Sequence, residues 1–362
     1  MTRKQFLTIG AALTLALSVG YRSHHAAAST VSKIYLVDSV LIRATREISL
    51  DFLDVSNPAN VVKLKTLSIE GNHDVAVKGK YLYADAWRHL VVCDVSNLAA
   101  PVIVDTIKLV FLSYPDDRMM FIDGPLGATG NRGCGCEKYQ TVAPTASTGT
   151  AGSLARFAVV GDYLYCVDYS NLLVFDVSNP ARPQYKNQIA VSWEIETIFS
   201  YQSNLFIGGT RGMFIYSIAD PKNPAPVSQF VHARSCDPVV VENDTAYVTL
   251  RAGSACGGTS NQMDIVSVSS IQSPVLIKTF NLFNPYGLAV KNRIAYVCDG
   301  SAGLKILDVS NPAAIKAMAT VATVFPLDVI VNDTILYVST TTGTALFGVG
   351  NSSSPNLLSI IQ

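Results

Sequence analysis

Short apolar runs separated by tight polar turns recur along the chain from Lys33 onward. Five clear pairs of runs are DVAVKGKYLYAD from Asp74, FAVVGDYLYCVD from Phe157, PVVVENDTAYVT from Pro238, GLAVKNRIAYVCD from Gly287 and DVIVNDTILYVS from Asp328. Looser copies begin at Lys33 and Thr197. The turns carry residues that tolerate a left-handed backbone, namely Gly79, Gly161, Asn243, Asn292 and Asn332. Each pair therefore predicts a β-hairpin.

A third apolar run follows each hairpin, and in several copies it ends on the phrase DVSNP or DVSNL. The last apolar residues of the third runs are Val55, Val95, Val177, Ile218, Val268, Val309 and Val349. Their spacings are 40, 82, 41, 50, 41 and 40 residues. A fourth extended run completes each copy. The repeat of about 41 residues therefore predicts a four-stranded antiparallel unit.

Such a unit cannot bury both of its faces alone, and radial repetition, as in a β-propeller, lets neighbouring units cover each other. Seven complete copies predict an all-β propeller of seven blades. The spacing of 82 residues leaves room for an eighth blade as the alternative. Residues 113–152 are rich in Gly, Thr and Pro and show no hairpin pair, which favours an inserted loop. We expect one propeller domain over residues 31–362.

The phrase, the apolar strand before it and the LYV-type strand before that resemble the LVIVD repeat family of bacterial and archaeal surface or exported propeller proteins. The resemblance covers nearly everything after the first 28 residues. It implies a propeller and a location outside the cytoplasm, and it brings no general activity with it. Three copies depart from the phrase and read SIADP, SVSSI and GVGNS, so no role requires its Asp in every blade.

The phrase predicts the end of a strand and a turn. Its Ser and Asn side chains are expected to bond to nearby backbone amides, and its Pro presets the turn and stops the strand. A calcium role for the Asp is disfavoured, because three of the seven copies lack it and the neighbouring ligands of a calcium loop are absent.

The first 28 residues predict export. Arg3 and Lys4 precede an apolar run over residues 6–19, and small residues lead up to Ala28. This arrangement is typical of a secretory signal peptide cleaved after Ala28. LSVGY also resembles a lipoprotein signal, but Tyr21 occupies the place of the lipidated Cys. We expect a periplasmic, extracellular or cell-surface protein that is not lipidated at this position.

Charge limits the classes of partner. The chain has 27 basic and 27 acidic residues, and removal of the signal peptide leaves 24 basic ones and a net charge of −3. Nucleic-acid binders carry a basic excess, so nucleic acid is not an expected partner. No other run is long and apolar enough for a membrane helix. We expect a monomer that binds a surface protein or a polar, carbohydrate-like ligand.

The seven cysteines leave at least one thiol unpaired in the monomer. Cys236 and Cys256 fall on the same face of the fifth copy, so export favours a disulfide between them over two independent thiols. Cys134 and Cys136 in GCGC match neither redox nor zinc spacing. The other three lie in predicted strands and are expected to be structural: Cys93, Cys166 and Cys298.

Both long insertions fall on one face of the predicted propeller. Residues 113–152 connect a fourth strand to the next first strand, and residues 251–262 connect a second strand to a third. Loops of these two classes emerge together because the strands alternate in direction. Because binding residues often lie on loops, we expect the contact surface on this face. The alternative is that the insertions accumulated without a function, at loop tips that tolerate them.

Polar residues at the starts of the first strands form a predicted collar at the channel mouth of the same face. The candidate ligand-binding residues are His73, Asp74, Glu194, Glu196, Arg234, Asp237, Asn284 and Tyr286. Asn72, Arg156 and Asp328 belong to the same predicted collar. The collar suits a small polar or sugar-like ligand, or a metal held by Glu194, Glu196, Asp237 and His73. We favour a structural role in bonding loop backbone groups, with no metal and no cofactor.

No catalytic residue is predicted. The chain has no GXSXG elbow, no HEXXH and no phosphate loop. The leading hypothesis is therefore a binding module without catalysis. The rival hypothesis is a hydrolase-like or lyase-like enzyme with a site at the channel mouth, built from Glu196, Arg234, Asp237, Tyr286 and His73.

Overall fold

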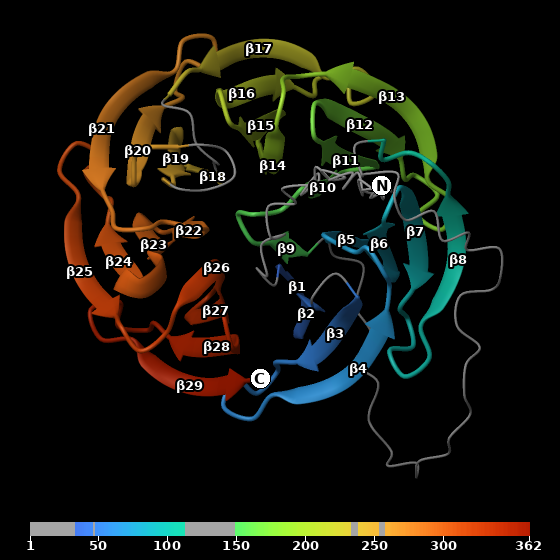
Figure 1. The fold of residues 1–362 in the computed structure, drawn as a ribbon, viewed down its shortest axis with the longest axis horizontal. Coiled ribbons are helices and arrows are strands. Elements are labelled where there is room, and N and C mark those ends of the chain that lie inside the picture. The colour runs from blue at the N-terminus through green and yellow to red at the C-terminus, as the bar shows by residue number, and fades with distance from the viewer. Residues whose placement is uncertain (1–32, 46–47, 113–148, 233–237, 253–257) are drawn as a thin grey trace, which may run out of the picture.

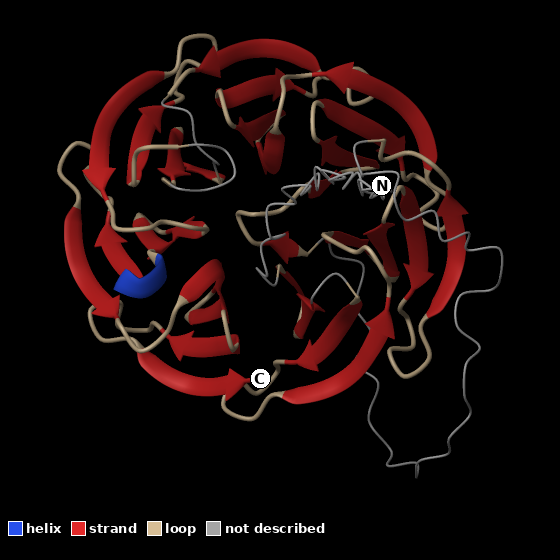
Figure 2. Ribbon diagram, in the orientation of Figure 1, coloured by secondary structure: helices blue, strands red, loops and turns tan. Residues whose placement is uncertain are grey.

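The computed structural model describes residues 33–45, 48–112, 149–232, 238–252 and 258–362. Within these ranges the regular elements are β-strands, apart from a 3-10 turn at Gly300–Ala302 (Figure 2). The described strands form seven antiparallel sheets arranged around a centre (Figure 1). The predicted seven-bladed propeller is confirmed, and the eight-bladed alternative is not.

Each blade runs from an innermost strand to an outermost one, and blades are numbered here in chain order (Figure 1). The innermost strands are β1 Ile34–Val37, β5 Val75–Lys78, β10 Phe157–Val160, β14 Ile195–Tyr201, β18 Val239–Glu242, β22 Leu288–Lys291 and β26 Pro326–Asn332. The second strands are β2 Val40–Thr45, β6 Tyr81–Ala86, β11 Tyr163–Asp168, β15 Asn204–Gly209, β19 Thr245–Leu250, β23 Ile294–Cys298 and β27 Ile335–Thr340. The third strands are β3 Ser49–Asp54, β7 His89–Asp94, β12 Asn171–Asp176, β16 Gly212–Ser217, β20 Gln262–Ser267, β24 Leu304–Asp308 and β28 Gly343–Gly348. The outermost strands are β4 Val62–Ser68, β8 Val102–Ile107, β13 Gln184–Ala190, β17 Ala225–Phe230, β21 Val275–Asn281, β25 Lys316–Val321 and β29 Asn356–Ile361.

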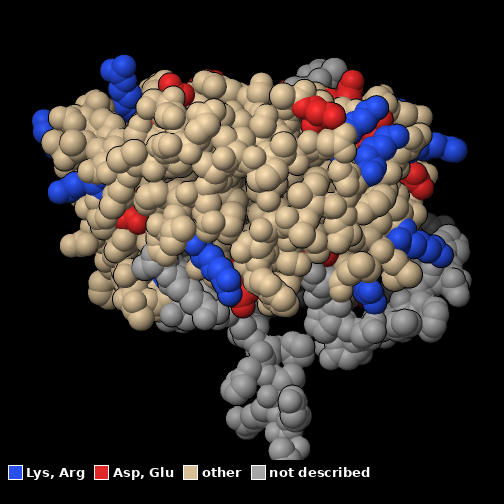
Figure 3. Space-filling view, turned by 90° about the horizontal axis from the view of Figure 1, so that it is seen from above, with Lys and Arg blue, Asp and Glu red and all other residues tan. Residues whose placement is uncertain are grey.

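The core lies between the blades. The second and third strands are buried at almost every position, as in β6 and β15, because both faces of each sheet are covered by its neighbours. The outermost strands are largely exposed, and few charged side chains lie on the rim seen in Figure 3. The innermost strands contact one another all the way round, and β1 contacts both β26 and β5. The ring is therefore closed.

Side chains close the ring between blade 7 and blade 1, whose sheets share no strand in the described chain. Arg43 Nη1 donates to the carbonyl of Ile361 at 3.1 Å. Its Nη2 donates to the carbonyl of Gln362 at 3.3 Å and to Asp51 Oδ2 at 2.9 Å. Polar contacts thus join the first blade to the end of the chain.

A fifth strand completes blade 1 from far along the chain. β9 Thr150–Ala151 pairs antiparallel with β1, with Tyr35 opposite Ala151. The segment predicted as an inserted loop over residues 113–152 therefore ends in a strand at the inner edge of blade 1. Its residues 113–148 lie outside the described ranges.

The repeated phrase ends the third strand and forms a turn, as predicted, but the side chains that hold it differ. In blade 1 the amide of Ser56 donates to Asp54 Oδ1 at 2.9 Å, and the amide of Ala59 donates to Asn57 Oδ1 at 3.2 Å. The same pairs of bonds recur in blades 2, 3 and 6. Asp and Asn therefore accept the amide bonds, and the expectation that Ser does so is wrong.

The first turn of each blade adopts a left-handed backbone at Gly79, Gly161, Asn243 and Asn292, as predicted. In blade 7 the left-handed residue is Asp333, with φ of 49°, and the expectation for Asn332 is wrong. Asn332 still pairs with Ile335 at the end of β26, so the turn begins one residue later.

Candidate functional site on the loop face and at the channel mouth

Two faces of the propeller differ in chemistry. We call the face with the second-to-third and fourth-to-first loops the loop face, and the opposite one the turn face. The large apolar side chains exposed in described loops are Ile48, Leu109, Leu112, Tyr169, Trp193, Val231 and Phe283. All of them lie on the loop face, and none lies in a described turn of the other face. Exposed large apolar side chains that gather in the loops of one face are typical of an interaction surface.

An aromatic pair stands out on the loop face. The Trp193 side chain is 64% exposed and the Tyr169 side chain 42%. Their rings meet edge to face, with centroids 6.1 Å apart. Backbone hydrogen bonds hold the two segments that carry these rings. The amide of Ile195 donates to the carbonyl of Tyr169 at 2.7 Å, and the amide of Thr210 donates to the carbonyl of Glu194 at 3.1 Å. The pair is therefore presented on a fixed backbone.

Charged residues gather where the innermost strands begin. The residue four positions before the end of each innermost strand occupies an equivalent place in its blade. These residues are Lys33, Asp74, Arg156, Thr197, Pro238, Gly287 and Asp328. With Glu196 beside Thr197, charges alternate in sign over five consecutive blades. We call Asp328, Lys33, Asp74, Arg156 and Glu196 the channel cluster.

Asp74 joins the middle of the channel cluster. Its carboxylate accepts hydrogen bonds from the backbone amides of Arg156 and Phe157, the latter at 3.1 Å. Lys33 Nζ lies 3.6 Å from Asp74 Oδ2. Burial raises the pKa of the Asp74 carboxyl and lowers the pKa of the Lys33 ammonium, although each charge favours the ionised form of the other.

Asp85, near the end of β6, fixes the loop that leads into blade 2. Its Oδ1 accepts the backbone amides of His73 at 2.7 Å and of Asp74 at 2.9 Å. Its Oδ2 lies 3.5 Å from His73 Nδ1 and 3.7 Å from Arg156 Nη1. The carboxylate therefore orders the loop backbone and connects it to the channel cluster.

Asp328 is the most enclosed carboxylate of the cluster. Its Oδ1 accepts bonds from Ser153 Oγ at 3.2 Å and from the amide of Val329 at 3.0 Å, while its Oδ2 has no hydrogen-bond partner in the described chain. A Cβ at Gly152 would lie 2.0 Å from Oδ2, and one at Gly287 2.3 Å from Oδ1, so only glycine leaves room for the carboxylate. Burial raises the pKa of Asp328 to about 7.

Glu196 is the second carboxyl with a pKa near neutrality. Burial raises its pKa to about 7, while Lys33 and Arg251 favour its charged form. Glu196 and Asp328 can therefore both exchange protons near pH 7, which is a property of functional sites as well as of buried ion networks.

The structure places the other predicted collar residues in different settings. Glu194 Oε2 accepts a bond from Thr210 Oγ1 at 3.1 Å. The amide of Asn284 donates to Asp299 Oδ1 at 2.8 Å, so this loop is fixed in the same way as the one before blade 2. Arg251 lies over the ring of Tyr286, 4.0 Å from its centroid. Four residues of the predicted collar therefore belong to the channel cluster, namely Asp74, Arg156, Glu196 and Asp328.

Several predicted residues fall outside the described ranges. These are Arg234, Asp237, Cys236, Cys256, Cys134 and Cys136. The three cysteines predicted to be structural are described, buried and free: Cys93, Cys166 and Cys298. Burial raises the pKa of the Cys93 thiol to about 12, as expected for a packing residue.

Sequence reasoning missed Lys33, Asp85 and Arg251. Lys33 precedes IYLV just as Asp74 precedes VAVK. Alignment of the repeat copies could therefore have placed Lys33 in the collar. Asp85 and Arg251 gain their roles from loops that fold back on them, and no local pattern marks that. Within the described ranges no three His, Cys, Asp or Glu side chains are grouped to hold a metal. No helix in those ranges is long and apolar enough to cross a membrane.

Comparisons with known proteins identify the repeat and the fold. The family model of the LVIVD repeat matches residues 72–108, 151–191 and 286–323, which correspond to blades 2, 3 and 6. No curated protein matches the chain.

Similar solved structures include the periplasmic gluconolactonase of Pseudomonas aeruginosa, with a TM-score of 0.63 and 10% identity over 92% of this chain and 95% of that one. A protein from Lactobacillus plantarum gives a TM-score of 0.61 and 11% identity over 92% and 95% of the two chains. BamB from Moraxella catarrhalis gives a TM-score of 0.51 and 11% identity over 86% and 94%. At these identities the likeness is one of fold alone.

Proposed function

Because the chain carries LVIVD repeats in a seven-bladed propeller, we propose that it is an exported binding module whose loop face contacts a partner protein. The observation that carries the proposal is the one-sided distribution of exposed apolar side chains in the described loops. A purely structural scaffold gains nothing from exposing a Trp and a Phe in the loops of one face, while the described turns of the other face expose no large apolar side chain.

The extent of the apolar surface favours a protein over a small ligand. Its members come from loops of blades 1 to 5, and Phe283 in the loop into blade 6 extends it further. Protein interfaces of standard size cover about 800 Å² per partner and are anchored by Trp, Tyr and other large side chains. Trp193 and Tyr169 suit that role because the fixed backbone lowers the entropy lost on binding.

Site-specific photo-crosslinking tests this surface. A benzophenone amino acid replaces Trp193 or Phe283 in the protein expressed in its own host. The matched control is Tyr185, an aromatic residue 46% exposed in blade 3 but on the outermost strand β13. One adduct of the same mass from both loop-face positions, weakened by the Tyr169→Ala substitution, is expected. Adducts from position 185 but from neither loop-face position would overturn the proposal.

The proposal of export is based on the predicted signal peptide. It is supported by the gluconolactonase of Pseudomonas aeruginosa, which has the same fold and is periplasmic. Its test is the mass and N-terminal sequence of the protein recovered from the cell envelope or the medium. A mature chain that begins at Ser29 is expected. Recovery of the full-length chain in the cytoplasm alone would remove export from the proposal and leave the loop face to be tested separately.

A second candidate is an enzyme site, hydrolase-like or lyase-like, at the channel mouth. The observation in its favour is the pair of carboxyls, Glu196 and Asp328, with pKa values of about 7 beside Lys33. The Glu196→Gln variant keeps the shape and removes the titrating proton. Turnover of a substrate panel by the native protein, lost in this variant, would support catalysis. Equal activity of the two proteins, or none in either, would reject Glu196 as a catalytic group.

A further inference from the structure

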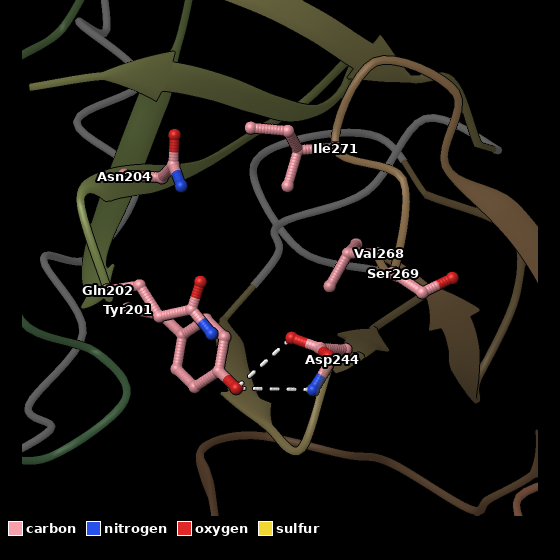
Figure 4. A pocket seen from close by; sticks show the side chains of 7 residues that line it. All are labelled: Tyr201, Gln202, Asn204, Asp244, Val268, Ser269 and Ile271. Carbon is pink, nitrogen blue, oxygen red and sulfur yellow. Dashed lines mark hydrogen bonds between the residues drawn. The ribbon is translucent and has the colours of Figure 1, made fainter. Parts of the chain in front are cut away.

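A polar groove lies between blades 4 and 5 on the turn face, opposite the proposed contact surface. It has a volume of about 240 Å³. Seven residues from two first turns and one repeated phrase line it: Tyr201, Gln202, Asn204, Asp244, Val268, Ser269 and Ile271 (Figure 4). The volume is enough for one small ring, and too little for a peptide.

A short polar side chain stands at the edge of the groove. Asn204 opens β15, opposite Tyr201 at the end of β14. Four other blades carry large apolar residues at the same register position, and each packs against an apolar cluster: Tyr81, Tyr163, Ile294 and Ile335. Asn204 belongs to no such cluster. Blade 4 thus leaves open a space that several other blades fill.

Asn204 is a polar group without a partner in this space. The residue is 8% exposed, and its side-chain amide makes no hydrogen bond to any part of the chain that the structure describes. Neither amide atom is fully buried, so the amide is within reach of solvent. Figure 4 shows the amide directed toward the groove. The amide is therefore open to a ligand, which can donate to its oxygen and accept from its nitrogen in place of water.

The remaining lining restricts the chemistry of a ligand. Gln202 and Ser269 add an amide and a hydroxyl, each able to donate and to accept. Val268 and Ile271 supply an aliphatic surface. The only formal charge in the lining is Asp244, whose Oδ1 accepts a bond from the Tyr201 hydroxyl at 3.2 Å. An anion finds no cationic partner there.

Hydroxyl groups around an aliphatic ring match this combination of amides, hydroxyl and apolar surface. We propose that the groove binds a neutral, hydroxyl-rich ring, about the size of one sugar residue, with the Asn204 amide as its central hydrogen-bonding group. The site is distinct from the loop face and is independent of the proposed function, so either can fail alone.

Saturation-transfer NMR with methyl glycosides of glucose, galactose, mannose and N-acetylglucosamine tests the site. Each probe is used at about 10 mM, because one small ring is expected to bind with a millimolar dissociation constant. The Asn204→Tyr variant places in blade 4 the residue found at this register in blades 2 and 3 and fills the groove. We expect a signal from at least one glycoside that falls at least tenfold in this variant.

Two serines give a matched comparison. Ser269 lines the groove, and Ser310 occupies the same place in the phrase of blade 6. Ser269→Ala is expected to weaken binding about three- to tenfold through one lost hydrogen bond, and Ser310→Ala to leave it unchanged. This comparison decides the matter if Asn204→Tyr does not fold. No signal from any glycoside, equal signals in the two serine variants, or stronger competition by glucuronate or inorganic phosphate would overturn the proposal.

Discussion

The Tyr83 hydroxyl in blade 2 donates a hydrogen bond of 3.0 Å to the carbonyl oxygen of Pro180, the last residue of the repeated phrase in blade 3. Tyr165 makes the equivalent bond of 2.9 Å to Pro221 in blade 4. From blade 7, Ser359 Oγ donates at 2.7 Å to the carbonyl of Pro58 in blade 1. The phrase is therefore a connector as well as a turn, because its final carbonyl accepts a bond from the blade before it.

Loss of the Tyr83 hydroxyl is expected to destabilise the propeller. Tyr83→Phe keeps the buried ring and removes the donor to Pro180, which should lower the free energy of unfolding by about 1 kcal/mol. Tyr185→Phe is the control, because its exposed contact to Gln188 is 3.4 Å long and should contribute little. Denaturant unfolding of both variants measures the difference. Equal midpoints would mean that the inter-blade bond contributes no net stability.

Ring closure is expected to depend on Arg43. Arg43→Met removes the bonds to Ile361, Gln362 and Asp51, and we expect a loss of about 3 kcal/mol because a buried carboxylate loses a charged partner. The control is Lys63→Met, which removes an exposed contact of 2.7 Å to the same carboxylate and should cost less than about 1 kcal/mol. Thermal or denaturant unfolding gives both values. A larger loss of unfolding free energy for Lys63→Met than for Arg43→Met would show that the Arg43 contacts to Ile361 and Gln362 do not stabilise the ring.

The stability of the protein is expected to depend on pH through Asp328. Its pKa is raised by burial from 3.8 to about 7, so the folded state holds this proton more tightly than the unfolded state. The associated stability is fully present below about pH 4 and is lost as the pH rises toward 7. Asp328→Asn stays neutral, so it should be more stable than the native protein at pH 8, by at most about 4 kcal/mol, and similar at pH 4.

Unfolding of Asp328→Asn at a series of pH values measures this effect. Asp333→Asn is the control, because that carboxylate is exposed beside Lys291. A variant whose stability relative to the native protein does not change between pH 4 and pH 8 would contradict a buried, titrating Asp328.

Trp193 is expected to report directly on the loop face. The chain has two Trp residues, so Trp87→Phe leaves Trp193 as the only one. Its emission should be at long wavelength and strongly quenched by acrylamide, because most of the side chain is exposed. Trp193→Phe provides the comparison, since the half-buried Trp87 should be quenched less. Weak quenching of Trp193 would contradict its exposure and remove the anchor from the proposed contact surface.

Periodicity along the chain was sufficient for the architecture. Alternating runs joined by Gly79 or Asn243 predict hairpins from local backbone preferences alone, and the structure forms them there. The candidate site was less accessible to this reasoning. Four members of the channel cluster were predicted as collar residues: Asp74, Arg156, Glu196 and Asp328. The fifth, Lys33, whose charge lies beside Asp74, was missed.

What the sequence determined by itself is therefore the blade: its four strands, its turns and the number of its copies, because these follow from interactions between residues close in the chain. Only the tertiary structure decided which differences between the copies produce a charged cluster or a groove. Lys33 lies near Asp328 because the ring closes, and their mutual influence spans nearly the whole chain. The groove beside Asn204 forms only because residues of blade 5, among them Asp244 and Ile271, line its other side. Such relationships depend on packing between blades, which no local pattern encodes.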